Sequence, residues 1–456
     1  MKGAGHVKTL YQATSKKMNR FFYSYPYIIL ISLIGSYGFI ANQEMLVIYI
    51  LAGILSIQWI FIRDLVPTLI IMMILGIVPL DRYGEVSYFI PVILYVLPFL
   101  VPSFIIHLIV YPPKFIRGRL FYTTLFVAIA ITFGGALSPY YFNNFSGASL
   151  YYFFLLGFFM VIIYQFQVNY TPNKKDLHLY FAKTMVGVGL MGILMVFSFY
   201  YLNWDWIQSQ GPDSYFQWSN NLSNNLLISM PFAFYLSYKS KFGLPYFLFG
   251  SLQFIALVLT FSRGGMIFGS LSFVMLVSLT FFLKPKRILS DGVLILLLSF
   301  GIYLFSERYF VGMYEVYSSI LSTITVSEEE SRYKMFEMAI RNFKNYPLFG
   351  TGLGFSTAEH YDPQPMGMYW YHSTLSQVIG SFGILGILAY GYQSLVRLFT
   401  LIEKIHPFNF YVLMVFIGFG GYSLVNVGYF IPLPMVAFLT QMMIVVKVQN
   451  TQSSRD

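Results

Sequence analysis

Cysteine is absent from this sequence of 456 residues, and charged residues are scarce. Without cysteine the chain has no disulfide, no thiol nucleophile and no cysteine-ligated metal site. Charged residues make up 10% of the chain, whereas an ordinary soluble domain carries about a quarter. Hydrophobic residues make up 57%, and the mean hydropathy is +0.66. This balance excludes a soluble globular protein and predicts an integral membrane protein.

Clustered carboxylates are also missing, because the sequence contains no Asp-x-Asp motif and its acidic residues are scattered. A divalent cation would need several oxygen ligands close together. We therefore expect neither a metal site nor any other cofactor.

Long apolar runs fill most of the chain, and they are roughly 17–25 residues long, as a spanning helix requires. The strands of a membrane β-barrel would alternate in polarity over about ten residues, and that pattern is not found. We predict an all-α polytopic bundle of about 12–14 spanning helices that forms one membrane domain over residues 1–456. No cleavable signal peptide is evident, so the first run is interpreted as an anchor. The candidate segments are 22–41, 44–62, 65–80, 87–111, 120–137, 149–168, 181–202, 223–239, 244–262, 264–283, 289–306, 372–399, 408–424 and 429–447.

The net charge of +10 is distributed very unevenly once these segments are drawn. With both termini in the cytoplasm, about 21 of the 28 lysines and arginines lie on the cytoplasmic side, which follows the positive-inside rule. The excess of basic residues therefore indicates how the chain is oriented in the membrane. We expect membrane lipids as partners and no nucleic acid. The basic residues left on the external side are Arg82, Arg263, Arg308, Arg332, Lys334, Arg341 and Lys344.

The longest polar interval is an external loop over residues 307–371. Ser327 and Glu330 have the spacing of a capping box, and Pro347 would stop a helix that starts there. We predict a short amphipathic helix between them. At 100° per residue, Ala339, Phe343 and Phe336 lie within about 40° of Arg332 and form an apolar stripe.

Arg332 is the one charge in that stripe. An arginine on a packed surface needs an anionic partner, because an unpaired buried charge is costly. The partner is either a carboxylate, from Glu307, Glu315 or Glu359, or an anionic ligand, which we favour.

Two more candidate residues lie at the external ends of apolar segments. Arg263 stands in the run Ser262-Arg263-Gly264-Gly265. It is either a snorkelling residue at a helix end or a cation that contacts a ligand in the headgroup layer. His372 opens a segment, and it is either an interfacial hydrogen-bonding residue or a general base. His360 is the weaker candidate for a base.

Two groups of glycines follow the loop helix. Gly350, Gly352 and Gly354 fit a tight turn, and such a turn can also present backbone N–H groups to an anion. No βαβ unit surrounds them, so they are not a dinucleotide motif. Gly380, Gly383 and Gly386 predict close helix packing.

In the order and spacing of these motifs, the sequence resembles the bacterial O-antigen ligase and polysaccharide polymerase family over roughly residues 220–386. The similarity rests on Ser262-Arg263-Gly264, Arg332 four residues before Phe336, the run from Pro347 to Gly354, and His372 with the glycines after it. Two positions depart from the family, since Phe336 stands where tryptophan is usual and Ser373 where asparagine is usual.

The resemblance implies a metal-independent glycosyltransferase of the cytoplasmic (inner) membrane with an extracytoplasmic active site. Its donor would be a glycan linked to undecaprenyl diphosphate, its acceptor a second glycan, and a chain-length regulator protein a further partner. Carried over to this chain, Arg263 and Arg332 hold the diphosphate and His372 activates the acceptor hydroxyl. Asn220 matches a family asparagine in the preceding external loop. From the glycine turn described above, we expect Gly352 at the diphosphate.

We interpret the chain as a polymerase that joins lipid-linked repeat units. A ligase that transfers the glycan to lipid A core or another acceptor is the close alternative. A flippase or other transporter is a second alternative. It ranks lower because a transporter should carry ionisable residues near the membrane midplane. The middles of the candidate segments are nearly free of such residues.

Overall fold

The computed structural model describes residues 14–77, 86–137, 157–203, 219–309, 328–353, 371–426 and 435–453. Within these ranges, the side chains of residues 77, 86–93, 219, 302, 304–309 and 328–332 are outside the description. The described residues contain helices and no strand, which confirms the all-α prediction.

Each of the fourteen predicted apolar segments corresponds to a helix. Two further helices are described, Thr14–Phe22 before α2 and one in the loop that is predicted to be external. Short η1 and η5 turns (Val66–Thr68 and Pro285–Arg287) precede α4 and α15. The helices are α2 (Tyr25–Ile40), α3 (Glu44–Phe61), α4 (Leu69–Ile77), α5 (Val86–Val110), α6 (Arg119–Phe133), α9 (Phe159–Tyr170), α10 (Leu177–Leu202), α12 (Ser219–Lys239), α13 (Leu244–Val258), α14 (Arg263–Leu283), α15 (Ile288–Tyr309), α17 (Glu328–Asn345), α18 (Thr374–Ile402), α19 (Pro407–Tyr422) and α20 (Ala437–Gln452).

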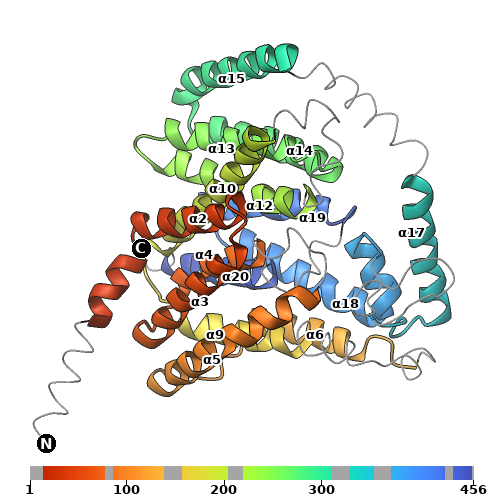
Figure 1. Cartoon of the computed structure of the whole chain (residues 1–456). Coiled ribbons are helices and arrows are strands. Elements are labelled where there is room, and N and C mark those ends of the chain that lie inside the picture. Colours follow the sequence, from red (N-terminus) through yellow and green to blue (C-terminus); the bar gives the residue numbers. More distant parts are fainter. Residues whose placement is uncertain are drawn as a thin grey trace, which may run out of the picture.

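The helix α10 is at the centre of the bundle, where it packs against α2, α12, α13 and α20. Small residues allow this close packing, since a Cβ on Gly187 would lie 2.4 Å from Ile28 and one on Gly192 would lie 2.8 Å from Leu226. Close approach through glycine is typical of membrane helix pairs. Figure 1 shows most helices side by side along one direction, with α15 at one margin and α17 beside α18.

Among the described residues, four helices are long and apolar enough to span a membrane: α3, α10, α14 and α18. The bent pair Thr14–Phe22 and Tyr25–Ile40 makes a fifth if it is one span. The chain is therefore polytopic, whereas the predicted number of 12–14 spans is not confirmed. Several other helices are apolar but shorter than 18 residues.

The hydrogen bonds between loops fall into two groups, one at each end of the bundle. At one end Lys174 Nζ lies 3.0 Å from Asp64 Oδ2, and Asn169 donates to the carbonyl of Lys114. Gln452 donates to Asn173 at the same end. All of these residues lie in segments predicted to be cytoplasmic. The grouping agrees with the predicted alternation of the chain, while the side that each end faces stays a prediction.

The helix α18 is interrupted at Gly383, where φ is +60° and ψ is −147°. In an unbroken helix the carbonyls of Gly380 and Ser381 would accept from residues 384 and 385. Here those carbonyls instead accept from Thr351 N (3.0 Å) and Gly352 N (2.9 Å).

The N–H groups freed by the same interruption also find partners in the segment after α17. Ile384 N donates to Pro347 O (2.8 Å), and Leu385 N donates to Leu348 O (3.1 Å). The segment 347–352 is thus inserted into the hydrogen-bond ladder of α18, and the two predicted glycine groups pack on each other.

Candidate functional site

The end of the bundle opposite Lys174 carries three of the predicted site residues, and Arg263 is the first of them. It is the first residue of α14, and four residues separate it from Val258, where α13 ends. The turn between these helices holds Phe261 at a positive φ of 53°, a strained conformation for a residue with a Cβ. Ser262 then caps α14 by accepting from Gly265 N. The helix N-terminus adds a partial positive charge beside the guanidinium, which favours an anion.

The two glycines after Arg263 allow neighbouring helices to approach α14 closely. A Cβ on Gly264 would lie 3.2 Å from Tyr422, the last residue of α19, and 2.9 Å from Val425, which follows that helix. A Cβ on Gly265 would lie 2.3 Å from Ser223 Oγ of α12. The motif thus holds the start of α14 against α12 and α19.

Asn220, near the start of α12, is hydrogen-bonded to the residue that caps α14 and to the last residue of α19. Its Oδ1 accepts from Ser262 Oγ at 2.8 Å, next to Arg263. Its backbone carbonyl accepts from the Tyr422 hydroxyl at 3.2 Å. The side chain is exposed. Neighbouring Asn221 instead accepts through its carbonyl from Asn225, so Asn220 is the asparagine beside the arginine.

The hydrogen bonds continue from Tyr422 to the residues beside His372. Asn426 Nδ2 donates to the Tyr422 hydroxyl at 2.8 Å. Thr374 N donates to the carbonyls of Ser423 (2.9 Å) and Asn426 (3.3 Å). One connected set of bonds therefore joins the ends of α12, α14, α19 and α18, which carry Asn220, Arg263 and His372 or their neighbours.

His372 lies at a sharp turn that separates it from the residue before it. Its φ is +48°, its side chain is exposed, and Ser373 caps α18 by accepting from Ser376 N. Tyr371, by contrast, is buried, and burial raises the pKa of its hydroxyl to about 12. Tyr371 therefore stays protonated at neutral pH.

Arg332 lies in α17, and its side chain is outside the described residues. The helix itself is packed on α18 near His372. Asn342 Nδ2 donates to the Tyr371 hydroxyl at 2.6 Å, and Ala339 approaches Gly380. The predicted apolar stripe is correct for Ala339 but wrong for Phe336, which is 45% exposed. The buried face is Met335, Ala339 and Asn342, because the docking contact with Tyr371 turns this side of the helix inward.

Gly352 is buried, and its N–H already donates to Ser381 O. The structure thus gives this glycine a packing role, and its predicted contact with the diphosphate stays a prediction. Gly354 and His360 lie outside the described residues.

Sequence reasoning missed the residues that connect the site. Tyr422, Ser423 and Asn426 stand at the end of an apolar segment, and nothing in their spacing marks them. Asn342 carried a weak signal, since it is a polar residue next to the apolar stripe of α17. Among the described residues there is no group of three or more histidine or acidic side chains that could hold a metal ion. Metal independence stays a prediction.

Residues 248–391 match the family model described as O-antigen ligase. The matched stretch includes Arg263, Arg332, Gly352 and His372, while Asn220 precedes it. No curated protein matches the chain significantly. The resemblance stated from the motifs is confirmed over this stretch.

Proposed function

We propose that this chain, with its O-antigen ligase domain over residues 248–391, is a glycosyltransferase that polymerises lipid-linked repeat units. The family match and the apolar helices support a membrane enzyme of polysaccharide assembly. The proposal adds the reaction, the donor and the roles of individual residues. Its donor is an oligosaccharide on undecaprenyl diphosphate, and its acceptor is a second glycan at the extracytoplasmic face of the inner membrane.

One observation carries the proposal, namely the hydrogen-bond set that joins Asn220, Ser262, Tyr422, Asn426 and Thr374. These bonds bring an arginine at a helix N-terminus and an exposed histidine to the same end of the bundle. The docking of α17 on Tyr371 adds the helix that carries Arg332. A cationic site beside a base is what transfer from a diphosphate requires.

In the proposed reaction the acceptor hydroxyl attacks the anomeric carbon of the donor sugar. The bond between that carbon and the diphosphate oxygen breaks, and the lipid diphosphate leaves with the bonding electrons. His372 takes the hydroxyl proton, and a positioned base of this kind contributes about 10²–10⁴ in rate. Arg263 and Arg332 stabilise the negative charge that develops on the diphosphate, because guanidinium groups bind phosphate oxygens in pairs.

The ligase reaction is the second candidate, and the name of the matching family favours it. Both reactions use the same donor and the same base, and they differ only in the acceptor. A transporter is favoured by neither the family match nor the placement of the polar residues at one end.

Purified chain supplied with lipid-linked repeat units alone, in the presence of EDTA, separates these functions. A polymerase lengthens the glycans in steps of one repeat and releases the lipid diphosphate. A ligase releases it only after a second acceptor is added. Absence of turnover with every acceptor would contradict the enzymatic proposal, and turnover restored only by a divalent cation would contradict the metal-independent mechanism.

A further inference from the structure

The helix α17 has a second apolar face, which lies beside the face that packs on Tyr371 and α18. At 100° per residue its members fall within about 80° of one another. They are Tyr333, Phe336, Ile340 and Phe343. Tyr333 is 61% exposed and Phe336 is 45% exposed, whereas Ile340 and Phe343 are half-buried. The bundle therefore leaves this second apolar face largely uncovered.

The remaining face of α17 is charged and mostly basic. Its residues Lys334, Glu337, Arg341 and Lys344 are all exposed, and three of these four are basic. A helix with aromatic residues on its apolar face and basic residues on its polar face is typical of helices that lie in a membrane interface. Although α17 has 18 residues, it is not among the candidate spans of the described chain.

The direction of α17 is that of a helix in the plane of a membrane. Figure 1 shows α17 running across the direction that most helices share, at one end of the bundle beside α18. The four candidate spans belong to this bundle, so the shared direction follows the membrane normal. A helix that crosses it at the end of the bundle lies along the membrane surface.

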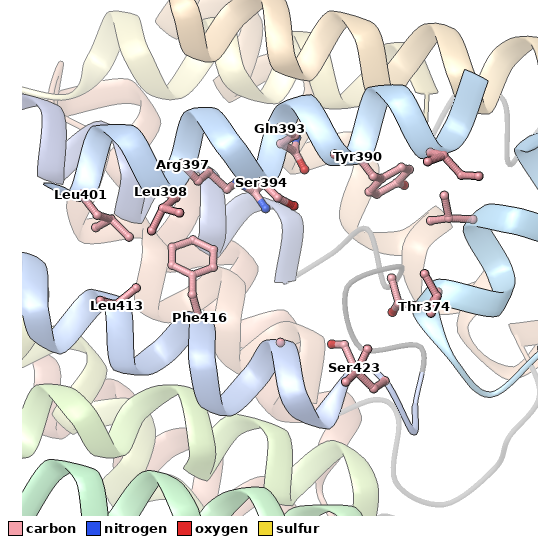
Figure 2. A pocket seen from close by; sticks show the side chains of 16 residues that line it. Thr374, Tyr390, Gln393, Ser394, Arg397, Leu398, Leu401, Leu413, Phe416 and Ser423 are labelled. Atoms are coloured by element: carbon pink, nitrogen blue, oxygen red, sulfur yellow. The ribbon is translucent and has the colours of Figure 1, made fainter. Parts of the chain in front are cut away.

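The depth of α17 follows from the helices beside it. The groove between α18 and α19 has mainly aliphatic walls and reaches Thr374 at the site end (Figure 2). Leu375 and Leu424 at this end are 51% and 56% exposed, and in a membrane protein such leucines contact lipid hydrocarbon. The contacts of α17, with Tyr371 just before α18 and with Gly380 in its second turn, lie at the same level. We infer that α17 lies at the boundary between hydrocarbon and headgroups.

A glycan is the alternative occupant of the second apolar face, because sugars also pack on aromatic rings. A glycan site needs polar groups that fix the orientation of the sugar. This face offers one, the hydroxyl of Tyr333, beside the side chains of Phe336, Ile340 and Phe343. A continuous apolar stretch next to a basic face favours the lipid surface.

We propose that the second apolar face of α17 inserts into the lipid leaflet on the side of the candidate site. Tyr333 and Phe336 enter the outer part of the acyl chains, to a depth of about 5–10 Å, and the charged face meets headgroups and water. The insertion holds the helix that carries Arg332 at the level of the headgroups, where the diphosphate of a lipid-linked donor lies. The insertion itself does not depend on glycosyl transfer, so it can fail or hold separately from the proposed function.

The test uses the full chain in vesicles of phosphatidylethanolamine and phosphatidylglycerol, and the lack of cysteine allows a single fluorescent label. The dye is attached to Phe336→Cys in one protein and to Glu337→Cys in the matched control, whose native side chain is also exposed. Lipids that carry a nitroxide should quench the dye at residue 336 several-fold more strongly than the dye at residue 337. A nitroxide near the headgroup should quench more than one at the end of the acyl chain, and aqueous iodide should favour residue 337.

A second variant keeps the dye away from Phe336. With the dye on Tyr333→Cys, the added substitution Phe336→Asp should sharply reduce quenching by lipid nitroxides, because a charge is costly in hydrocarbon. Its thermal unfolding in detergent should stay unchanged, since the Phe336 side chain is exposed, and Glu337→Asp should keep the quenching.

Equal lipid quenching at residues 336 and 337, or unchanged quenching after Phe336→Asp, would overturn the proposal. A dye at residue 336 that lipid nitroxides do not reach, and that only added lipid-linked oligosaccharide shields from iodide, would assign the face to the glycan and overturn it as well.

Discussion

Tyr371 and His372 are neighbours in the chain with opposite surroundings. Tyr371 is 3% exposed and bonded to Asn342, whereas His372 is exposed and held at a positive φ. A left-handed conformation costs a residue with a Cβ about 1–2 kcal/mol. Such outliers persist where the surroundings fix them and often mark functional positions. Here the buried tyrosine and the cap of α18 hold the histidine in this turn.

The Tyr371 hydroxyl can be tested by its removal. Tyr371→Phe leaves the buried Asn342 amide without its acceptor, so the free energy of unfolding should fall by about 1–3 kcal/mol. Thermal unfolding of the purified protein measures this loss. Tyr333→Phe, on the exposed face of α17, is the matched control and should unfold like wild type. Equal stability of the Tyr371→Phe protein would show that the contact does not hold α17.

The role of Arg332 depends on the shape of its side chain. Arg332→Lys keeps the charge but loses the planar fork that binds two phosphate oxygens. We therefore expect its transfer rate to fall nearly as far as that of Arg332→Ala. Arg341→Lys, at an exposed position of the same helix, should stay at the wild-type rate. A fully active Arg332→Lys enzyme would rule out a bidentate clamp at this position.

At the scale of elements, the interruption of α18 is the feature that connects the loop to the membrane helices. The carbonyls and N–H groups that Gly383 frees are the ones that the segment 347–352 uses. A Cβ on Gly383 would lie 2.4 Å from Pro347 O, and its φ and ψ are adopted almost only by glycine.

Gly383→Ala should therefore undock this segment and lower stability by at least about 2 kcal/mol. Gly53→Ala, in α3 where a Cβ would meet no atom within 4 Å, should be neutral or slightly stabilising because alanine favours the helix. The difference between their unfolding midpoints measures the effect. Midpoints that coincide would mean that the interruption contributes nothing to docking.

The apolar runs predicted fourteen of the described helices because length and hydropathy are local properties of the chain. The capping box and Pro347 likewise predicted α17. The interruption of α18 could not be predicted, because it depends on a segment about 30 residues earlier in the chain filling the broken ladder. The same holds for Asn220 and Tyr422, whose contact joins positions 202 residues apart.

At the scale of the whole molecule, the two ends of the bundle have different compositions. One end holds the basic loops and the other holds the candidate site. The positive-inside rule predicts that the first end faces the cytoplasm, and the absence of cysteine from the sequence makes that prediction easy to test.

Single cysteines introduced at exposed positions should label from opposite sides of the membrane. Leu348→Cys lies at the end with the site and Phe242→Cys at the other, and both native side chains are more than half exposed. An impermeant maleimide should label the first in intact spheroplasts and the second only after permeabilisation. The reverse pattern would place the site in the cytoplasm.

The most direct measurement is transfer by the purified full chain carrying His372→Ala, with lipid-linked oligosaccharide as donor. Loss of the base should lower the transfer rate by about 10²–10⁴, while binding of the donor, measured separately, stays at the wild-type level. A variant that transfers glycan as fast as wild type would contradict the assignment of His372 and, with it, the proposed active site.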